Sequence, residues 1–176
     1  MKILLSEQQL GEGITRMAGE IRAHYQGKPL TIVGVLIGSL VLVADLIRRL
    51  DIPLKIDLVQ ARSYKGTRPG PLSINTDLLG NIRGRDVLLV DDIFDTGNTL
   101  NDLIPQLDDL GPATIRTAVL LRKQGQSKVS FTPDFIGFDI PNVFVVGFGL
   151  DYRDQYRNLP HVAALEPAEL GEEPGR

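Results

Sequence analysis

The stretch VLLVDDIFDTGNTL, residues 87–100, joins a run of aliphatic residues to three carboxylates. The aliphatic run predicts a buried strand, which Asp91 and Asp92 follow directly. Because adjacent strand residues face opposite ways, these two acids are predicted to have different roles. One would reach a sugar hydroxyl pair or a hydrated Mg²⁺, and the other would order the surrounding shell. Asp95 lies one short turn further on, where it can serve as a base.

The segment from Asp95 to Thr99 lies between this strand and a predicted helix. A helix start offers unpaired backbone N–H groups and a partial positive charge. Gly97 allows the backbone to approach a ligand closely, and Thr96 and Thr99 supply hydroxyls. The segment therefore predicts a cradle for a phosphate monoester. It contains no Lys or Arg, so neutral donors would do most of the binding.

Other interpretations of the stretch remain open at this point. Asp and Thr often only cap a helix, and an acid pair after a strand can simply be solvated. A Walker B strand would need a GxxxxGK[ST] loop, which the chain lacks. A phospho-acceptor receiver domain would carry its acid pair near the first strand, whereas this pair lies midway along the chain. A phosphate, a diol with a metal and a base, in this order, describe a phosphorylated ribose with chemistry at its far end.

Length and composition set the broad class. The chain has 176 residues, 43% of them hydrophobic and 23% charged, as expected for one globular domain. Its net charge of -3 gives no overall basic field for nucleic acid. It contains no Cys, which excludes disulfides and thiolate chemistry. The first residues contain too short an apolar segment for a secretory signal, so we expect a cytoplasmic protein.

Aliphatic strands alternate with helices along the chain, which predicts an α/β fold with a doubly wound, mainly parallel sheet. Helices are predicted at 14–25, 40–50 and 98–111, the last kinked or shortened by Pro105, and strands at 31–39, 55–64, 86–90, 113–123 and 143–149. We expect a single domain over residues 1–165. The N-terminal segment and about 135–165 would form a small hood. The acidic, Pro/Gly-rich residues 166–176 would form a disordered tail.

The quoted stretch resembles the phosphoribosyl pyrophosphate motif of the type I phosphoribosyltransferases. Asp95 is similar to the residue found at that place in the 6-oxopurine branch, the hypoxanthine-guanine phosphoribosyltransferases. The resemblance extends from about Ile32 to Val162 and includes the long segment PDFIGFDIPNVFVVGFGLDYRDQYRNLPHV. It implies transfer of ribose 5-phosphate from Mg²⁺-bound phosphoribosyl pyrophosphate to hypoxanthine or guanine, which releases pyrophosphate and forms IMP or GMP.

The resemblance also implies the roles of the quoted stretch. The 5-phosphate would be held by Asp95, Thr96, Gly97, Asn98 and Thr99. The acid pair, Asp91 and Asp92, would meet the ribose hydroxyls and the metal. Asp95 would also be the general base that takes the proton from ring nitrogen 7 as the glycosidic bond forms.

At the purine, the resemblance assigns four further residues. Lys123 would donate to the 6-oxo group, although by pattern it is equally a surface lysine. Phe144 would stack on the purine, and the backbone of Val145 would contact the ring edge, although the pattern alone makes both core strand residues. Asp151 would lie near the purine and a second Mg²⁺, so the metal-binding residues implied are Asp91, Asp92 and Asp151, directly or through water.

The pyrophosphate loop is implied at four consecutive positions and one distant one: Leu36, Ile37, Gly38, Ser39 and Arg157. The family order here is Leu-Lys-Gly, often with a cis peptide bond, and the chain has Ile37 in place of the Lys. Ile37 therefore removes a cation on which pyrophosphate affinity and subunit contacts depend in the family. Ser63 and Tyr64 match the start of the family's mobile lid, which would close over the reaction and exclude water.

The resemblance implies a homodimer or homotetramer. No apolar run reaches about 18 residues, so no membrane partner is expected, and the net charge of -3 argues against a nucleic-acid partner. A second function on the same fold stays open, that of a nucleotide-binding, RNA-binding attenuator. Such proteins resemble a uracil enzyme, typically carry another residue at the position of Asp95, and need a basic face for RNA.

Overall fold

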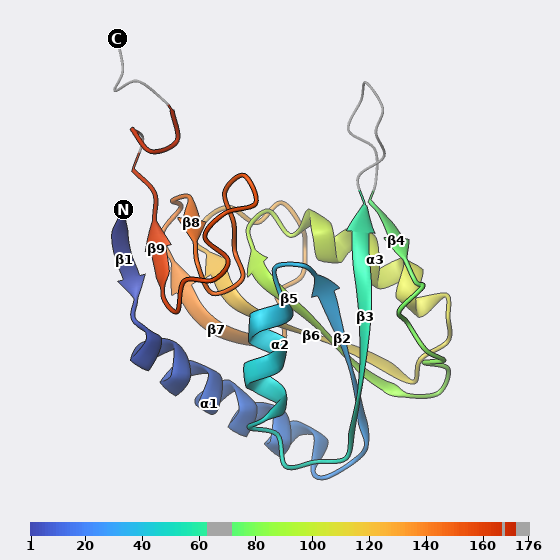
Figure 1. Cartoon of the computed structure of the whole chain (residues 1–176). Coiled ribbons are helices and arrows are strands. Elements are labelled where there is room, and N and C mark those ends of the chain that lie inside the picture. Colours follow the sequence, from blue (N-terminus) through green and yellow to red (C-terminus); the bar gives the residue numbers. More distant parts are fainter. Residues whose placement is uncertain (63–71, 167, 172–176) are drawn as a thin grey trace.

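The computed structural model describes residues 1–62, 72–166 and 168–171, and its main element is a six-stranded sheet in the order β4-β3-β2-β5-β6-β7 (Figure 1). Strands β3, β2, β5, β6 and β7 run parallel, and β4 pairs antiparallel with β3 at one edge. The strands are β2 (Leu30–Leu36), β3 (Leu54–Arg62), β4 (Ser73–Asn75), β5 (Asp86–Phe94), β6 (Thr114–Lys123) and β7 (Phe135–Ile140).

Helices cover both faces of this sheet. Two of them, α1 (Glu7–Tyr25) and α2 (Leu40–Ile47), lie on the near face in Figure 1, and α3 (Asn98–Asp108) lies on the far face. Each face has its own apolar core, because successive strand side chains alternate between the two sides. In β5, for example, Leu88 packs toward α1 and α2, and Leu89 packs toward α3. The predicted doubly wound, mainly parallel α/β fold is confirmed.

The N-terminal helix begins earlier than predicted. Ser6 and Gln9 form a capping box, in which the Ser6 hydroxyl accepts from the Gln9 N–H and the Gln9 side chain accepts from the Ser6 N–H. The first turn is polar on most sides, so apolar periodicity shows only from Ile14 onward. In α3 the helix continues past Pro105 to Asp108, and Gly111 follows with a φ of 76°.

A second, three-stranded sheet lies beside the end of β7 (Figure 1). It contains β1 (Lys2–Leu5), β9 (Val162–Ala164) and β8 (Val145–Val146), in the order β1-β9-β8. Of the strand expected at 143–149, only β8 forms, and it belongs to this small sheet. Residues 135–140, which the sequence assigned to the hood, form β7 of the main sheet. That the small sheet acts as a hood stays a prediction.

The described part of the C-terminal tail contacts the body of the protein. The Glu169 carboxylate lies 2.7 Å from the N-terminal ammonium of Met1, and the Tyr152 hydroxyl donates to the Leu170 carbonyl at 3.0 Å. The helices within the described ranges are all too short or too polar to cross a bilayer.

Candidate active site

The acid pair lies inside β5 rather than after it, because the strand continues from Asp86 through Phe94. The sequence placed the strand end at residue 90, where the aliphatic run stops. The partner strand β6 stays in register as far as Phe94 opposite Arg122, and this pairing carries β5 onward. The carboxyl ends of β2, β5 and β6 meet at one edge of the sheet, where open α/β sheets bind ligands.

The two acids differ in environment. Asp91 is only 6% exposed, and its Oδ1 accepts the backbone N–H of Asp92 at 3.0 Å. Burial raises the pKa of Asp91 well above its usual value, and the negative charge of Asp92 raises it further. Burial also raises the pKa of Asp92, against the opposing effects of its hydrogen bond to Asp91 and of the positive charge of Arg157. The pair therefore favours a cation or a proton between its members.

The predicted pyrophosphate loop, Leu36 to Ser39, packs directly against Asp92. A Cβ added to Gly38 would overlap the Asp92 carboxylate, and a Cβ added to Gly149 would overlap the Gly38 carbonyl oxygen. The peptide bond between Leu36 and Ile37 is cis, as the resemblance implied. The loop is thus held between β5 and the turn at Gly149, in contact with the acid pair.

The loop carries an apolar side chain where the family order has a cation. Ile37 is 50% exposed, and Leu40 at the start of α2 is 48% exposed. Ser39 is fully buried and donates its hydroxyl to the Val35 carbonyl at 2.7 Å, so it holds the loop in shape rather than presenting a hydroxyl to solvent.

The predicted phosphate loop, Asp95 to Thr99, has the geometry of an anion cradle. Gly97 is the N-cap of α3 with a φ of 86°, a conformation that glycine adopts without steric cost. No side chain caps the helix, and its first turn contains no acidic residue. Apart from the Asn98 N–H, which reaches the Thr96 hydroxyl, its first N–H groups therefore remain for a ligand. The Thr96 hydroxyl accepts from the Asn98 N–H at 3.4 Å, which bends the loop toward the helix.

Asp95 and Lys123 meet across the ends of β5 and β6. Lys123 Nζ donates to Asp95 Oδ2 at 2.8 Å. The lysine side chain is 11% exposed, whereas the aspartate is 42% exposed, so the cation is fixed from behind and the carboxylate faces outward. Asp95 directly follows β5 and Lys123 ends β6, 28 positions further along the chain, so sheet order brings them together.

This ion pair lines a pocket of about 220 Å³. The lining residues are Asp92, Ile93, Asp95, Lys123, Phe144, Val145, Leu150 and Asp151. Phe144 is 41% exposed and meets the ring of Tyr152 edge to face at 5.5 Å between centroids. The sequence pattern alone predicts that both residues belong to the core. This is confirmed for Val145, which is 5% exposed, and wrong for Phe144. An exposed aromatic ring in a polar pocket is a stacking surface for a flat ligand.

Arg157 contacts both Asp151 in the pocket wall and the turn at Gly149, which packs on the pyrophosphate loop. Its guanidinium donates to the Gly149 carbonyl at 2.7 Å and lies 2.7 Å from Asp151 Oδ1. The other oxygen of Asp151 accepts the Asp154 N–H at 2.9 Å. Arg157 therefore both orders this turn and adds positive charge near Asp92.

Ile93 and Leu150 line the pocket although the sequence did not single them out. Ile93 is an apolar residue between two acidic positions, which is a usable sign of a pocket wall. Leu150 reaches the pocket only because the chain turns back between Gly147 and Leu150, and no local signal marks it. Ser63 and Tyr64, the predicted start of the lid, lie outside the described residues.

The residues present fit a magnesium ion only when a substrate supplies further ligands. Within the ranges that the structure describes, no three acidic or histidine side chains gather closely enough to bind a metal alone. Mg²⁺ often binds through one or two carboxylates together with substrate phosphates and water, and Asp91 and Asp92 supply such carboxylates. The carboxylate of Asp151 is engaged by Arg157 and Asp154, so a metal would meet it through water.

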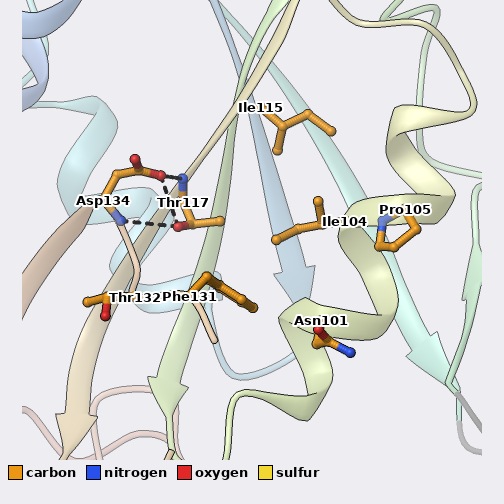
Figure 2. A pocket seen from close by; sticks show the side chains of 8 residues that line it. All are labelled: Asn101, Ile104, Pro105, Ile115, Thr117, Phe131, Thr132 and Asp134. Carbon is orange, nitrogen blue, oxygen red and sulfur yellow. Dashed lines mark hydrogen bonds between the residues drawn. The ribbon is translucent and has the colours of Figure 1, made fainter. Parts of the chain in front are cut away.

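Another cavity, of about 400 Å³, lies beside α3 on the far face of the sheet (Figure 2). Its walls include the apolar side chains of Ile104, Ile115 and Phe131. Its one acidic group, Asp134, is engaged by the N–H and hydroxyl of Thr117 and by Arg116. This cavity could enclose a small molecule, but its only acidic side chain is already hydrogen-bonded, unlike the carboxylates at the sheet edge.

The sequence is similar to known phosphoribosyltransferases. A family model described as a phosphoribosyl transferase domain matches residues 1–153. The hypoxanthine-guanine phosphoribosyltransferase of Bacillus subtilis is 37% identical over 169 residues, covering 95% of this chain and 94% of that protein. The enzyme of the same name from Staphylococcus aureus is 38% identical, with 94% of each chain covered. The bifunctional protein TilS/HprT of Listeria innocua is 39% identical, but this chain spans only 26% of its length.

Solved structures agree with these sequence matches. A hypoxanthine-guanine phosphoribosyltransferase of Bacillus anthracis, with a HEPES molecule in its active site, superimposes with a TM-score of 0.89 at 36% identity. The match covers 94% of this chain and 99% of that one. A variant of hypoxanthine phosphoribosyltransferase from Trypanosoma cruzi, complexed with the product IMP, gives a TM-score of 0.90 at 36% identity, with 97% and 93% covered.

Proposed function

Because the chain belongs to the hypoxanthine-guanine phosphoribosyltransferases of the phosphoribosyl transferase family, we propose that it is a purine-salvage enzyme. It transfers ribose 5-phosphate from Mg²⁺-bound phosphoribosyl pyrophosphate to hypoxanthine or guanine. The bond between the ribose C1 and pyrophosphate breaks, and a bond from C1 to a purine ring nitrogen forms. The observation that carries the proposal is the Asp95–Lys123 pair in the pocket beneath Phe144.

Asp95 is the proton acceptor in this proposal. Its carboxylate is partly exposed at the pocket, so it can reach a proton on ring nitrogen 7 once a base is bound. Lys123 donates to Asp95 in the free protein and would donate to the 6-oxo oxygen when a purine lies between them. A lysine in this place selects oxopurines, because the 6-amino group of adenine cannot accept its hydrogen bond.

The base lies against Phe144, with Val145 and Ile93 as apolar neighbours in the same pocket. The 5-phosphate lies on the N–H groups and hydroxyls of the loop from Asp95 to Thr99, at the start of α3. The pyrophosphate lies on the loop from Leu36 to Ser39, and the charge of Arg157 faces the same region.

The acid pair lies between the two phosphate-binding loops. Asp92 contacts Gly38 on one side, and the strand that contains it leads into the phosphate loop on the other. Asp91 and Asp92 would bind the ribose hydroxyls and the magnesium ion that arrives with phosphoribosyl pyrophosphate. When bound there, the metal would supply positive charge next to the leaving pyrophosphate. Burial raises the pKa of both acids, and a bound cation would offset this by stabilising their charged forms.

The test is a turnover assay with the purified chain, phosphoribosyl pyrophosphate, Mg²⁺ and each purine in turn, with nucleotide formation followed by chromatography. We expect IMP from hypoxanthine and GMP from guanine, with adenine a poor substrate. Omission of Mg²⁺ should abolish turnover. If neither oxopurine yields nucleotide under these conditions, the proposal is wrong.

We also propose that the chain assembles as a homodimer or homotetramer. Ile37 and Leu40 are both about half exposed next to the pyrophosphate loop, and such a pair of aliphatic side chains gains from burial against a second copy. Light scattering of the purified protein measures the mass directly, and a monomer at all concentrations would contradict the proposal.

A further inference from the structure

The segment that joins β6 to β7, residues 124–134, packs against the phosphate loop from outside. The backbone N–H of Lys128 donates to the Thr96 carbonyl at 2.8 Å. This bond joins two segments that are 32 residues apart, so only the tertiary fold brings them into contact. It fixes the Thr96 carbonyl, directly before Gly97.

The next residue, Val129, supports Gly97 itself. A Cβ added to Gly97 would overlap the Val129 Cγ2 methyl, and it would come within 2.8 Å of the Phe94 ring. Gly97 therefore lies directly on a floor made of one valine methyl group and one aromatic edge. Glycine has no side chain of its own with which to anchor this conformation, so the floor restricts the loop in its place.

Phe131 supports the same floor from below. Its ring meets Phe94 edge to face at 5.7 Å between centroids, and it forms part of the wall of the cavity beside α3 (Figure 2). Val129 and Phe131 are both partly buried against the core on the α3 side of the sheet. The floor is therefore continuous with that core and is as rigid as the packing behind it.

We propose that Val129 is a positioning residue that holds the Gly97 backbone in the orientation needed to bind the substrate's 5-phosphate. The inference rests on the proposed function, in which the loop from Asp95 to Thr99 receives this phosphate. The loop contains no Lys or Arg, so binding depends on several N–H groups that point at one place. Such multipoint binding loses strength quickly when the backbone can move by a fraction of an ångström.

The test compares two ligands that differ only in the 5-phosphate. The dissociation constants of GMP and guanosine are measured by calorimetry for the wild-type chain and for Val129→Ala. We expect Val129→Ala to weaken GMP binding by about tenfold and to leave guanosine binding unchanged. Val129→Thr keeps the shape of the side chain, so it should retain the wild-type preference for GMP.

Two controls separate positioning from loss of stability. Val87→Ala removes the same two methyl groups from the same core. Val87 lies at the start of β5, and the phosphate loop follows the end of that strand. This variant should therefore lower the unfolding temperature and leave the preference for GMP unchanged. Thr99→Ala removes a proposed phosphate contact and should itself reduce this preference.

Each outcome bears on one claim. If the wild-type chain binds guanosine as tightly as GMP, and Thr99→Ala changes nothing, the proposed phosphate loop is wrong. If the wild-type chain prefers GMP and Val129→Ala keeps that preference, or weakens both ligands equally, the proposed function stands and the role of Val129 is overturned.

Discussion

Asp91 in β5 and Asp95 just after it lie only four residues apart but in very different environments. Asp91 is buried, lacks a bonded cation among the described residues, and has a raised pKa. Asp95 is 42% exposed and lies 2.8 Å from the ammonium group of Lys123. The two positions share a sheet edge and a side-chain type but not their surroundings, since Asp91 lies within β5 and Asp95 directly follows it.

The difference assigns separate tasks to the two positions. A buried carboxylate without a cation is costly, and it is stabilised when a ligand brings a cation to it. A carboxylate held by a lysine at the rim of a pocket is oriented before the ligand arrives. The first arrangement suits metal-bound substrate, and the second suits proton transfer. Substitutions at these positions should therefore fail in different ways.

The largest effect is expected for Asp95→Asn. The amide keeps the size and one hydrogen-bond acceptor but cannot take a proton, so turnover should fall by about 10²- to 10⁴-fold. Binding of GMP should stay near the wild-type level. Steady-state kinetics and calorimetry measure the two quantities, with the exposed Asp51→Asn as the matched control. Unchanged turnover would remove Asp95 from the role of base.

Lys123→Ala should give the next largest effect. It removes a charged donor from the 6-oxo group and also releases Asp95 from its partner. A hydrogen bond to a charged group contributes about 1.5–3 kcal/mol, so the KM for hypoxanthine should rise by roughly 10- to 100-fold. Lys28→Ala, at an exposed position, is the control. If the preference for oxopurines over adenine were unaltered, Lys123 would not determine it.

Asp91→Asn should stabilise the protein while impairing its use of phosphoribosyl pyrophosphate. The amide can still accept the Asp92 N–H but carries no buried charge, so the free energy of unfolding at neutral pH should rise by about 1–2 kcal/mol. Because the folded pKa of Asp91 is raised, the wild-type chain is stabilised by protonation as the pH falls. The advantage of the variant should therefore shrink between neutral pH and about pH 4.

Thermal unfolding at several pH values, without substrate, measures this prediction. Asp109→Asn, at an exposed position after α3, should show no such pH-dependent advantage. A variant at residue 91 that is less stable than the wild type at neutral pH would show that the carboxylate contributes more through local contacts than it costs through burial.

The sequence predicts the four central strands of the main sheet, β3, β2, β5 and β6, because long aliphatic runs with helices between them allow few arrangements, but it misses the edge strands β4 and β7. It predicts the small sheet poorly, because β8 and β9 span two and three residues and are defined by pairing with distant partners. The end of β5 was missed for the same reason. Its last residues pair with β6, although their own side chains suggest a solvated turn.

The site shows the same division between local and long-range information. The conformation of the predicted phosphate loop was foreseeable, since a glycine at the start of a helix favours it locally. The exposure of Phe144 and the pairing of Asp95 with Lys123 were not predictable from pattern, because both depend on the sheet order and on the turn near Gly149. The contact of Val129 with Gly97 likewise has no local signal.

Ile37→Lys tests the same comparison by adding a second cation near the acid pair, beside that of Arg157. In the single chain Ile37 is half exposed in the loop that packs against Asp92, so a lysine there requires no repacking of the core. It should strengthen pyrophosphate binding by about two- to fivefold at low ionic strength, and salt should remove the gain because an exposed charge is screened. Product inhibition by pyrophosphate at low and high salt measures this, with Ile37→Met as the uncharged control of similar length.

An equal gain for both variants would mean that side-chain shape rather than charge governs the loop. No gain for either would mean that the backbone N–H groups and Arg157 already supply what pyrophosphate needs.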